Sequence, residues 1–133
     1  MEKIQKPDDQ WRAELDPDAY AVLRHQATEA PFTGKYTFEK ATGTYKCAGC
    51  GAAVFESDSK YDSGCGWPSF TASAHPDSVE LRSDNSHGMV RTEVVCARCG
   101  GHLGHVFDDG PVEAGGQRYC INSVALELDP AQG

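Results

Sequence analysis

The sequence predicts a mostly β protein with short helices near its N-terminus, and two observations support this fold class. Fourteen glycines and seven prolines in 133 residues imply many turns and leave few stretches that can form a long helix. Helical periodicity is convincing only up to about residue 30, and short β-like runs between turn residues follow. We therefore expect a single domain over residues 1–133, with a helical segment at about 8–30 and a β core at about 34–128.

The N-terminal segment predicts two short helices. Trp11 and Leu15 are four residues apart, which is the spacing of one helix face. Asp16 followed by Pro17 indicates a cap and the first residue of a second helix. One side of this second helix is predicted to carry Tyr20, Leu23 and Ala27, and the pattern ends at Pro31 and Gly34.

Eight short runs after Gly34 are predicted to be β-strands, because each is rich in β-branched or aromatic residues and ends at turn residues. Sharp turns are expected at residues 108–111 and at Gly115-Gly116. The predicted strands cover residues 35–38, 44–46, 53–55, 79–82, 89–95, 103–107, 118–121 and 124–128.

Composition and charge restrict the class of function. A net charge of −8 disfavours binding to a phosphate backbone, so we expect no nucleic-acid partner. The chain has no apolar run near the roughly 20 residues of a membrane span, and its first residues lack the apolar core of a signal peptide. We expect a cytoplasmic protein without a membrane partner. A secreted scaffold with three disulfides is an alternative, but six cysteines are sparse for that class.

Four of the six cysteines form two Cys-x-x-Cys pairs, Cys47 with Cys50 and Cys96 with Cys99, each followed at once by a glycine. Two such pairs supply four thiolates to one tetrahedral ion, most often zinc, and the glycines allow a tight turn. We therefore predict one structural zinc ion per chain. Two alternatives remain: iron in the same site, or a Cys₂His₂ site that uses His102 and His105 with the second pair.

The remaining two cysteines, Cys65 and Cys120, are left for chemistry. Arg118, Cys120 and Asn122 alternate, so on a strand they share one face, and the guanidinium is expected to lower the pKa of the thiol. Tyr119 is expected to point the other way, into packing. The competing interpretation is a buried, inert cysteine on a core strand.

Two further features point to a site. His102 and His105 lie between glycines directly after the second cysteine pair, and histidines can act as acid, base or hydrogen-bond donor near neutral pH. Cys65 and Trp67 lie in a turn rich in glycine and proline, which suits a binding-pocket wall. The isolated histidines are predicted to be ordinary surface residues: His25, His75 and His87.

At these residues the chain resembles the B-type peptide methionine sulfoxide reductases (methionine-R-sulfoxide reductases), from about Trp11 to Leu128. Several specific motifs occur in the family's order. They are Pro31-Phe32-Thr33-Gly34-Lys35-Tyr36, the segment from Gly43 to Cys50, Ser63-Gly64-Cys65-Gly66-Trp67-Pro68-Ser69-Phe70, the segment from Cys96 to Gly110, and Arg118-Tyr119-Cys120-Ile121-Asn122-Ser123.

The resemblance implies two twisted antiparallel sheets and a zinc ion away from the active site. It implies reduction of methionine R-sulfoxide, free or in proteins, which is a protein-repair activity under oxidative stress. Cys120 would be the nucleophile and Cys65 the resolving cysteine. Trp67 and Phe107 would bind substrate. His102, His105, Asn122, Arg118 and Asp109 would complete the site.

The mechanism implied by the resemblance has three steps. Cys120 is oxidised to a sulfenic acid, Cys65 forms a disulfide with it, and a thioredoxin-like dithiol reduces that disulfide. We expect a monomer. The loop at residues 111–117 is slightly longer than the family pattern, so its effect on substrate preference is not predicted.

A different class of protein also fits part of the sequence. A non-catalytic zinc-ribbon interaction module accounts for the four paired cysteines but not for Cys65, Cys120 or the histidine pair. A zinc hydrolase needs an open coordination position, and four thiolates leave none.

Overall fold

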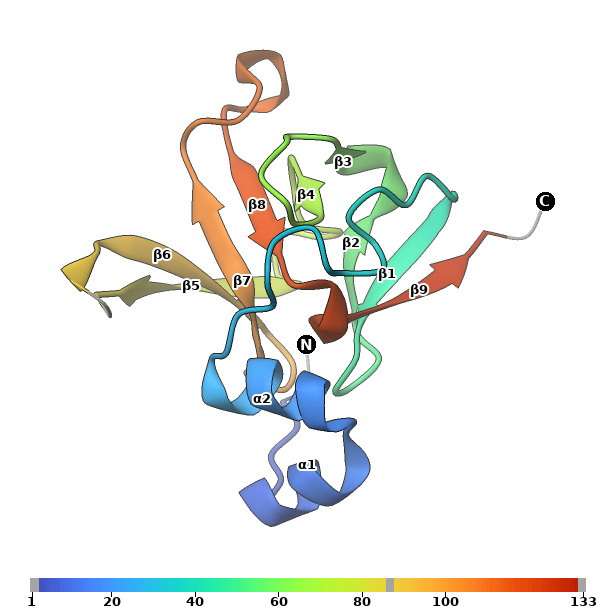
Figure 1. Cartoon of the computed structure of the whole chain (residues 1–133), viewed down its shortest axis with the longest axis vertical. Coiled ribbons are helices and arrows are strands. Elements are labelled where there is room, and N and C mark those ends of the chain that lie inside the picture. The colour runs from blue at the N-terminus through green and yellow to red at the C-terminus, as the bar shows by residue number, and fades with distance from the viewer. Residues whose placement is uncertain (1–2, 86–87, 132–133) are drawn as a thin grey trace.

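A computed structural model of the chain describes residues 3–85 and 88–131 (Figure 1). The N-terminal helices are α1 (Asp8–Glu14) and α2 (Pro17–His25). The strands are β1 (Gly43–Cys47), β2 (Ala53–Glu56), β3 (Lys60–Tyr61), β4 (Ser69–Phe70), β5 (Val79–Asp84), β6 (Arg91–Cys96), β7 (His102–Phe107), β8 (Arg118–Ile121) and β9 (Leu126–Pro130). Single 3-10 turns form η1 (Ser57–Ser59), η3 (Val112–Ala114) and η4 (Ser123–Ala125).

The strands form two antiparallel sheets, which confirms the predicted fold class. One sheet has the order β2-β1-β9, and the other has the order β3-β4-β8-β7-β6-β5. In Figure 1 the helices lie together at one end of the molecule, and the hairpin of β5 and β6 extends to one side. No helix within residues 3–85 and 88–131 is long and apolar enough to cross a membrane.

An aromatic cluster joins the two sheets. Phe55 of β2 stacks on Phe70 of β4 with ring centroids 4.5 Å apart, and it meets Tyr119 of β8 edge-on at 5.7 Å. Tyr45 of β1 also contacts Phe70 edge-on, at 5.2 Å. Offset and edge-to-face aromatic pairs stabilise a core beyond the area they bury. This cluster lies on the face of β8 opposite to Cys120, so the core and the candidate site occupy opposite faces of that strand.

The helices form as predicted, with one difference at their end. Asp16 caps α2 by accepting a hydrogen bond from the Asp18 backbone N–H at 3.1 Å, and Pro17 is its first residue. The helix ends at His25, because Gln26 adopts the left-handed conformation with φ of 58°. Ala27, which was predicted to continue the helix, therefore lies beyond it.

One predicted strand, at residues 35–38, is wrong. The chain turns there, since the backbone N–H of Thr37 donates to the carbonyl of Gly34 and that of Glu39 donates to the carbonyl of Tyr36. Tyr36 itself is buried against Tyr45, with ring centroids 5.4 Å apart. The aromatic residues of this run therefore reflect packing of a turn against the core and not strand pairing.

The other strands differ from prediction mainly at their ends. The strand predicted at residues 89–95 begins at Arg91, and the one predicted at 124–128 begins at Leu126, after η4. Strands β3 and β4 were not predicted, because a two-residue strand is too short to show alternation.

Candidate active site

The four paired cysteines gather at one place between the two sheets. Their sulfur atoms all lie within 4.8 Å of one another, with Cys47 and Cys99 3.7 Å apart and Cys50 and Cys96 3.6 Å apart. A tetrahedral ion with metal–sulfur bonds of about 2.3 Å places its ligands about 3.8 Å apart. The donor set and its spacing therefore fit a closed four-sulfur metal centre.

Local backbone geometry explains how each pair turns toward the ion. Gly51 and Gly100 have φ values of 79° and 74°, a region that L side chains rarely adopt. The N–H of each glycine donates to the carbonyl of the first cysteine of its pair, Cys47 or Cys96, at 2.8 Å. The prediction that these glycines make the turns is confirmed.

Cationic and apolar groups from the N-terminal segment cover the second pair. The Arg24 guanidinium of α2 donates to the Cys99 carbonyl at 3.0 Å. A side chain at Gly101 would meet Leu23 at 2.9 Å and the Cys99 sulfur at 3.3 Å, so the helix packs closely on this loop. Helix α2 thus packs against the cluster of four cysteines.

Cys65 and Cys120 lie side by side although they are far apart in the sequence. Their Sγ atoms are 2.9 Å apart, and both are free thiols. Cys120 is on β8, directly opposite Ser69 of β4, and the turn that precedes β4 carries Cys65. The sheet register therefore brings the two predicted thiols together.

The environment of the two thiols separates their pKa values. Burial opposes ionisation of Cys65, but hydrogen bonds with Cys120, Ser63 and Ser69 outweigh it and lower its pKa to about 7. Burial and the neighbouring Cys65 raise the pKa of Cys120 to about 12, against the opposing effect of Arg118. The expected lowering of the Cys120 pKa is therefore not found: the pair loses its first proton at Cys65.

Arg118 connects Cys120 to the acidic loop after β7. Its NH1 group donates to the Cys120 sulfur at 3.0 Å, while Nε and NH2 donate to the two carboxylate oxygens of Asp109 at 2.8 and 3.1 Å. The guanidinium also lies 4.6 Å from the ring centroid of Phe107. The two bonds to Asp109 hold the positive charge of Arg118 beside the Cys120 sulfur. This agrees with the prediction that Arg118 and Cys120, two residues apart on a strand, share one face.

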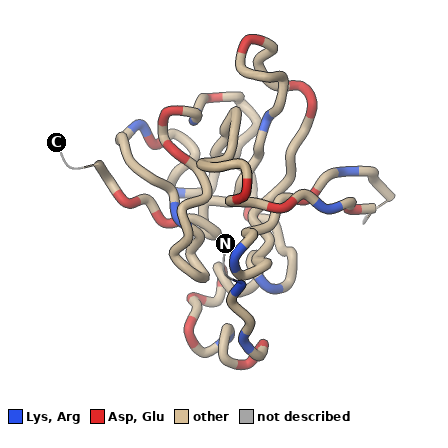
Figure 2. The backbone as a smooth tube through the Cα atoms, turned by 180° about the vertical axis from the view of Figure 1, so that it is seen from behind, with Lys and Arg blue, Asp and Glu red and all other residues tan. Residues whose placement is uncertain are grey.

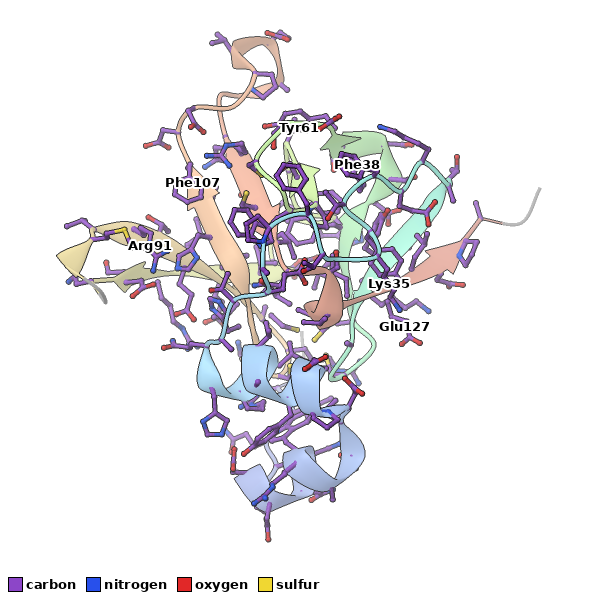
Figure 3. All side chains as sticks on the ribbon, viewed as in Figure 1. Lys35, Phe38, Tyr61, Arg91, Phe107 and Glu127 are labelled. Carbon is purple, nitrogen blue, oxygen red and sulfur yellow. The ribbon has the colours of Figure 1, made fainter. Side chains whose placement is uncertain are left out.

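A cavity of about 210 Å³ adjoins the two thiols. Phe107 of β7 and Arg91 of β6 lie on the same side of the molecule (Figure 3). Trp67 and Phe107 supply apolar surface, and the Trp67 indole N–H donates to the carbonyl of Glu29 at 3.0 Å. Most predicted site residues line this cavity: Cys65, Trp67, His105, Phe107, Arg118, Cys120 and Asn122.

The two histidines have different surroundings. His105 lines the cavity and bonds through Nε2 to Asp84 at 2.7 Å. His102 is buried and bonds through Nδ1 to Glu93 at 2.6 Å, and it lines a separate hollow beside α2. The rings meet edge-on, 5.3 Å apart. Neither histidine belongs to the four-sulfur cluster, so the alternative Cys₂His₂ site is not formed.

Burial lowers the pKa of His102, and the hydrogen bond and charge of Glu93 only partly oppose this effect. The neutral ring is thus favoured. The His102 ring contacts the His105 ring and does not line the cavity.

Asn122 lies at the end of β8 with its amide held on both sides. Its Oδ1 accepts from the Glu29 backbone N–H at 3.0 Å, and its Nδ2 donates to the Leu103 carbonyl at 3.0 Å. These partners fix which end of the amide is oxygen. One amide hydrogen remains for the cavity that Asn122 lines.

Four residues of the site were missed from the sequence: Thr28, Asp84, Arg91 and Glu93. The last three lie on β5 and β6, where Asp84 is directly opposite Arg91 and Glu93 is directly opposite His105 of β7. The alternation of charged residues along both strands was a signal for a polar sheet face. Its pairing with the histidine strand depends on register, which the sequence alone does not give. Predicted surface residues His25 and His75 lie outside the cavity lining, and His87 lies outside the described residues.

The fold and the site define a two-sheet protein with a pair of neighbouring thiols beside a cavity and a separate cluster of four cysteines that could hold a metal ion. The chain belongs to the SelR domain family, whose model matches residues 15–130. It is 60% identical over 129 residues to "Peptide methionine sulfoxide reductase MsrB" of Bradyrhizobium diazoefficiens, with 97% of this chain and 92% of that protein covered. A Pseudomonas putida protein of the same name is 55% identical over 133 residues, with 100% and 99% covered. One of Thiobacillus denitrificans is 55% identical over 125 residues, with 94% of each chain covered.

Proposed function

We propose that the protein reduces methionine sulfoxide in peptides, with specificity for the R epimer, and that Cys120 is its nucleophile. The observation that carries the proposal is the pair of free thiols 2.9 Å apart beside a cavity with Trp67 and Phe107 in its wall. An apolar wall suits the methyl group of the substrate, and a pair of thiols suits a two-electron reduction. The names of the relatives point to the same reaction.

The first step forms a sulfur–oxygen bond on Cys120. As Cys120 attacks the sulfoxide sulfur, its proton passes to the ionised Cys65, with which it shares a hydrogen bond. Arg118, in contact with the Cys120 sulfur, stabilises the charge that develops there. His105, fixed by Asp84, supplies a proton to the sulfoxide oxygen. The oxygen moves to Cys120, so methionine leaves and a sulfenic acid remains.

The second step closes a disulfide. The Cys65 sulfur attacks the sulfenic sulfur of Cys120 and displaces water, so Cys65 is oxidised by one electron and the sulfenic sulfur of Cys120 is reduced by one. A dithiol protein of the thioredoxin class then reduces the disulfide and is itself oxidised. The sum is one dithiol and one sulfoxide converted to one disulfide, methionine and water. This cycle repairs oxidised proteins in the cytoplasm, and we expect the protein to act as a monomer.

We also propose that the four-cysteine centre holds zinc, because four thiolates in a closed tetrahedral set favour that ion. Cys47 is the last residue of β1 and Cys96 is the last residue of β6, and the second cysteine of each pair lies in the turn that follows, so the ion ties the two sheets together. When bound, zinc supplies structural cross-linking. No step of the reaction uses it.

The negative charge of the protein agrees with a substrate that is not nucleic acid. Figure 2 shows lysine and arginine interspersed with acidic residues along most of the backbone, with some basic residues near one another by the N-terminus. Binding to a phosphate backbone depends on a basic patch or stripe. The expectation of no nucleic-acid partner stays a prediction.

Turnover of a methionine sulfoxide peptide, resolved by epimer, tests the function, with dithiothreitol and then with thioredoxin as reductant. We expect loss of the R epimer only, and no reduction by Cys120→Ser. Cys65→Ser is the matched control: without the neighbouring thiol, which raises the Cys120 pKa, Cys120 ionises more readily and the first step no longer needs a proton acceptor at Cys65. This variant should therefore keep the first step but lose turnover with thioredoxin. Consumption of the S epimer, or full activity of Cys120→Ser, would contradict the proposal. A wild type that reduces neither epimer would favour a non-catalytic zinc-ribbon module.

Mass spectrometry after one equivalent of substrate tests the second step. We expect a disulfide between Cys65 and Cys120 in the wild type and a sulfenic acid on Cys120 in Cys65→Ser. A disulfide between Cys120 and a cysteine of the metal centre would overturn the resolving role of Cys65.

A further inference from the structure

The segment between α2 and the core, residues 27–34 (here called the strap), rises from the end of α2 and passes in front of the sheet that contains β7 and β8 (Figure 1). Thr28 of the strap lines the cavity itself. Phe32 donates its backbone N–H to the carbonyl of Gly66 at 2.7 Å, next to Cys65 and Trp67. Phe32 has a φ of 65°, a conformation that is uncommon for a bulky residue and persists only where the surroundings hold it.

Glu29 makes the contacts that join the strap to two walls of the cavity. Its backbone N–H donates to Asn122 Oδ1, and its carbonyl accepts from the Trp67 indole N–H, both at 3.0 Å. One residue therefore bonds to Trp67 and to Asn122 in succession. A change in the path of the strap at this residue would move both side chains.

The side chain of Glu29 fixes that path. Its Oε1 accepts from the backbone N–H of Val124 at 3.0 Å, which is in the first turn of η4. A bond between a carboxylate and a backbone N–H at the start of a helical turn is charge-assisted. Its Oε2 is buried and finds no donor among the described residues. Burying a carboxylate oxygen without a donor is unfavourable. The other contacts of Glu29 therefore determine the position of its side chain.

The neighbouring residues leave room for this carboxylate and for little else. A side chain at Gly34 would come within 2.2 Å of both Glu29 Oε2 and Ser123 Oγ. Ser123 in turn accepts from the backbone N–H of Tyr36 at 3.2 Å. The chain is thus hydrogen-bonded to η4 on both sides of Gly34, by Glu29 within the strap and by Tyr36 just after it.

We propose that Glu29 is a positioning residue: by bonding to Val124 it fixes the strap so that its backbone orients Trp67 and Asn122 at the cavity. The proposal rests on the proposed function for its effect on turnover, but its structural part does not. Trp67 has one polar atom, and its bond to a fixed carbonyl determines which way the ring faces. Substrate positioning is sensitive to displacements of about 1 Å.

The experiment compares four variants. Glu29→Ala removes the acceptor, and Glu29→Asp keeps the charge but is one methylene shorter, so it loses the reach to Val124. Glu29→Gln keeps an acceptor oxygen at the same distance. Glu127→Ala is the matched control. Glu127 is an exposed carboxylate of β9 (Figure 3), and together with Glu29 it lines a second cavity, which lies beside α2 and away from the two thiols.

The first readout does not depend on activity. We expect hydrogen exchange of the Trp67 indole N–H, followed by NMR, to accelerate by about tenfold in Glu29→Ala and in Glu29→Asp. Exchange in Glu29→Gln and Glu127→Ala should match the wild type. The indole N–H of Trp11 gives an internal reference in the same spectrum, because Trp11 lies in the core beside the helices.

The second readout is the split between KM and kcat with a methionine sulfoxide peptide. A misplaced substrate wall should raise KM by roughly tenfold in Glu29→Ala. A smaller folded fraction alone would lower kcat and leave KM unchanged. Wild-type exchange and KM in Glu29→Ala and Glu29→Asp would overturn the proposal, as would a Glu29→Gln variant as impaired as Glu29→Ala. If the wild type reduces no sulfoxide, the proposed function fails, and the exchange rates alone decide the role of Glu29.

Discussion

His105 and Cys120 are directly opposed residues on the antiparallel strands β7 and β8. Opposed residues of an antiparallel pair point to the same face with their Cβ atoms about 4.5–5.5 Å apart. The same row continues to Glu93 of β6 on one side and to Ser69 of β4 on the other. The core of the candidate site is therefore a set of opposed residues on four neighbouring strands, which share one face of the sheet. Cys65 is not part of this set and comes from the turn that precedes β4.

Replacement of Cys65 by serine is expected to lower the pKa of Cys120. The neighbouring thiol raises this pKa through its hydrogen bond and its charge, so its removal leaves the influence of Arg118 less opposed. Iodoacetamide alkylation of Cys120 as a function of pH measures the shift. Arg118→Ala should move the profile the other way, to higher pH. In the wild type, alkylation near pH 7 should modify Cys65 first, because its pKa is about 7. A Cys65→Ser profile equal to that of the wild type would be inconsistent with coupling between the thiols.

Removal of the His105 ring is expected to slow the first chemical step by roughly 10²- to 10⁴-fold. Asp84→Asn, which keeps the shape of the residue that bonds to His105 Nε2, should slow the step less, because it weakens orientation and not proton transfer itself. Single-turnover reduction of a sulfoxide peptide, quenched before disulfide formation, measures both. If His105→Ala reduces sulfoxide at the wild-type rate, the histidine has no role in protonation.

Replacement of Glu93 by glutamine is expected to lower the pKa of His102 further, because Glu93 raises that pKa against the larger opposing effect of burial. His102 is favoured as the neutral ring in the folded state, whereas an unfolded histidine has a pKa of about 6.5. The unfolded state therefore binds more protons as pH falls below about 6.5, and this residue makes the folded state less stable there. A steeper loss of stability in Glu93→Gln between pH 6.5 and 5, measured by denaturant unfolding, would agree. An NMR titration in which the His102 pKa rises in the variant would disagree.

Loss of one metal-centre cysteine is expected to release the ion and to destabilise the fold by several kcal/mol, because binding energy at such a site is folding energy. Metal analysis and thermal unfolding of Cys47→Ala test this expectation. Cys65→Ala is the matched control: it removes a thiol outside the cluster and should keep about one zinc per chain. Retention of about one zinc with unchanged melting in Cys47→Ala would exclude the four-cysteine site.

The parts of the site that depend on local sequence could be predicted. The spacing of Cys47 and Cys50 and the following Gly51 define a turn, and the structure has that turn with the positive φ that glycine allows. The alternation along β8 also held, with Tyr119 and Ile121 buried and Cys120 on the other face. Both features depend only on neighbours within a few residues.

The parts that depend on tertiary pairing could not be predicted. Glu93 reaches His102 across a bulged pair of strands, with the register shift between Val94 and Val95. The pKa of Cys120 depends on Cys65, which comes from another segment, so an argument from Arg118 alone gave the wrong direction. In the sequence, nothing distinguishes Glu29 from an ordinary acidic residue in a loop. Its contacts with Trp67 and Asn122 exist only once the strap passes in front of the sheet that contains β7 and β8.

The alternation along β8 also limits how the length of the chain can vary. An insertion or deletion of one residue inside this strand would exchange Cys120 for Tyr119 on the cavity side and place a thiol among the core aromatics. The loop at residues 111–117 has no such restriction, because its ends are closed by a bond from the Gly110 N–H to the Gly116 carbonyl and its turn η3 is largely exposed. Length changes that leave the reaction intact should therefore be accommodated in this loop, and grafted sequences can be introduced there without shifting the reactive cysteine from its face.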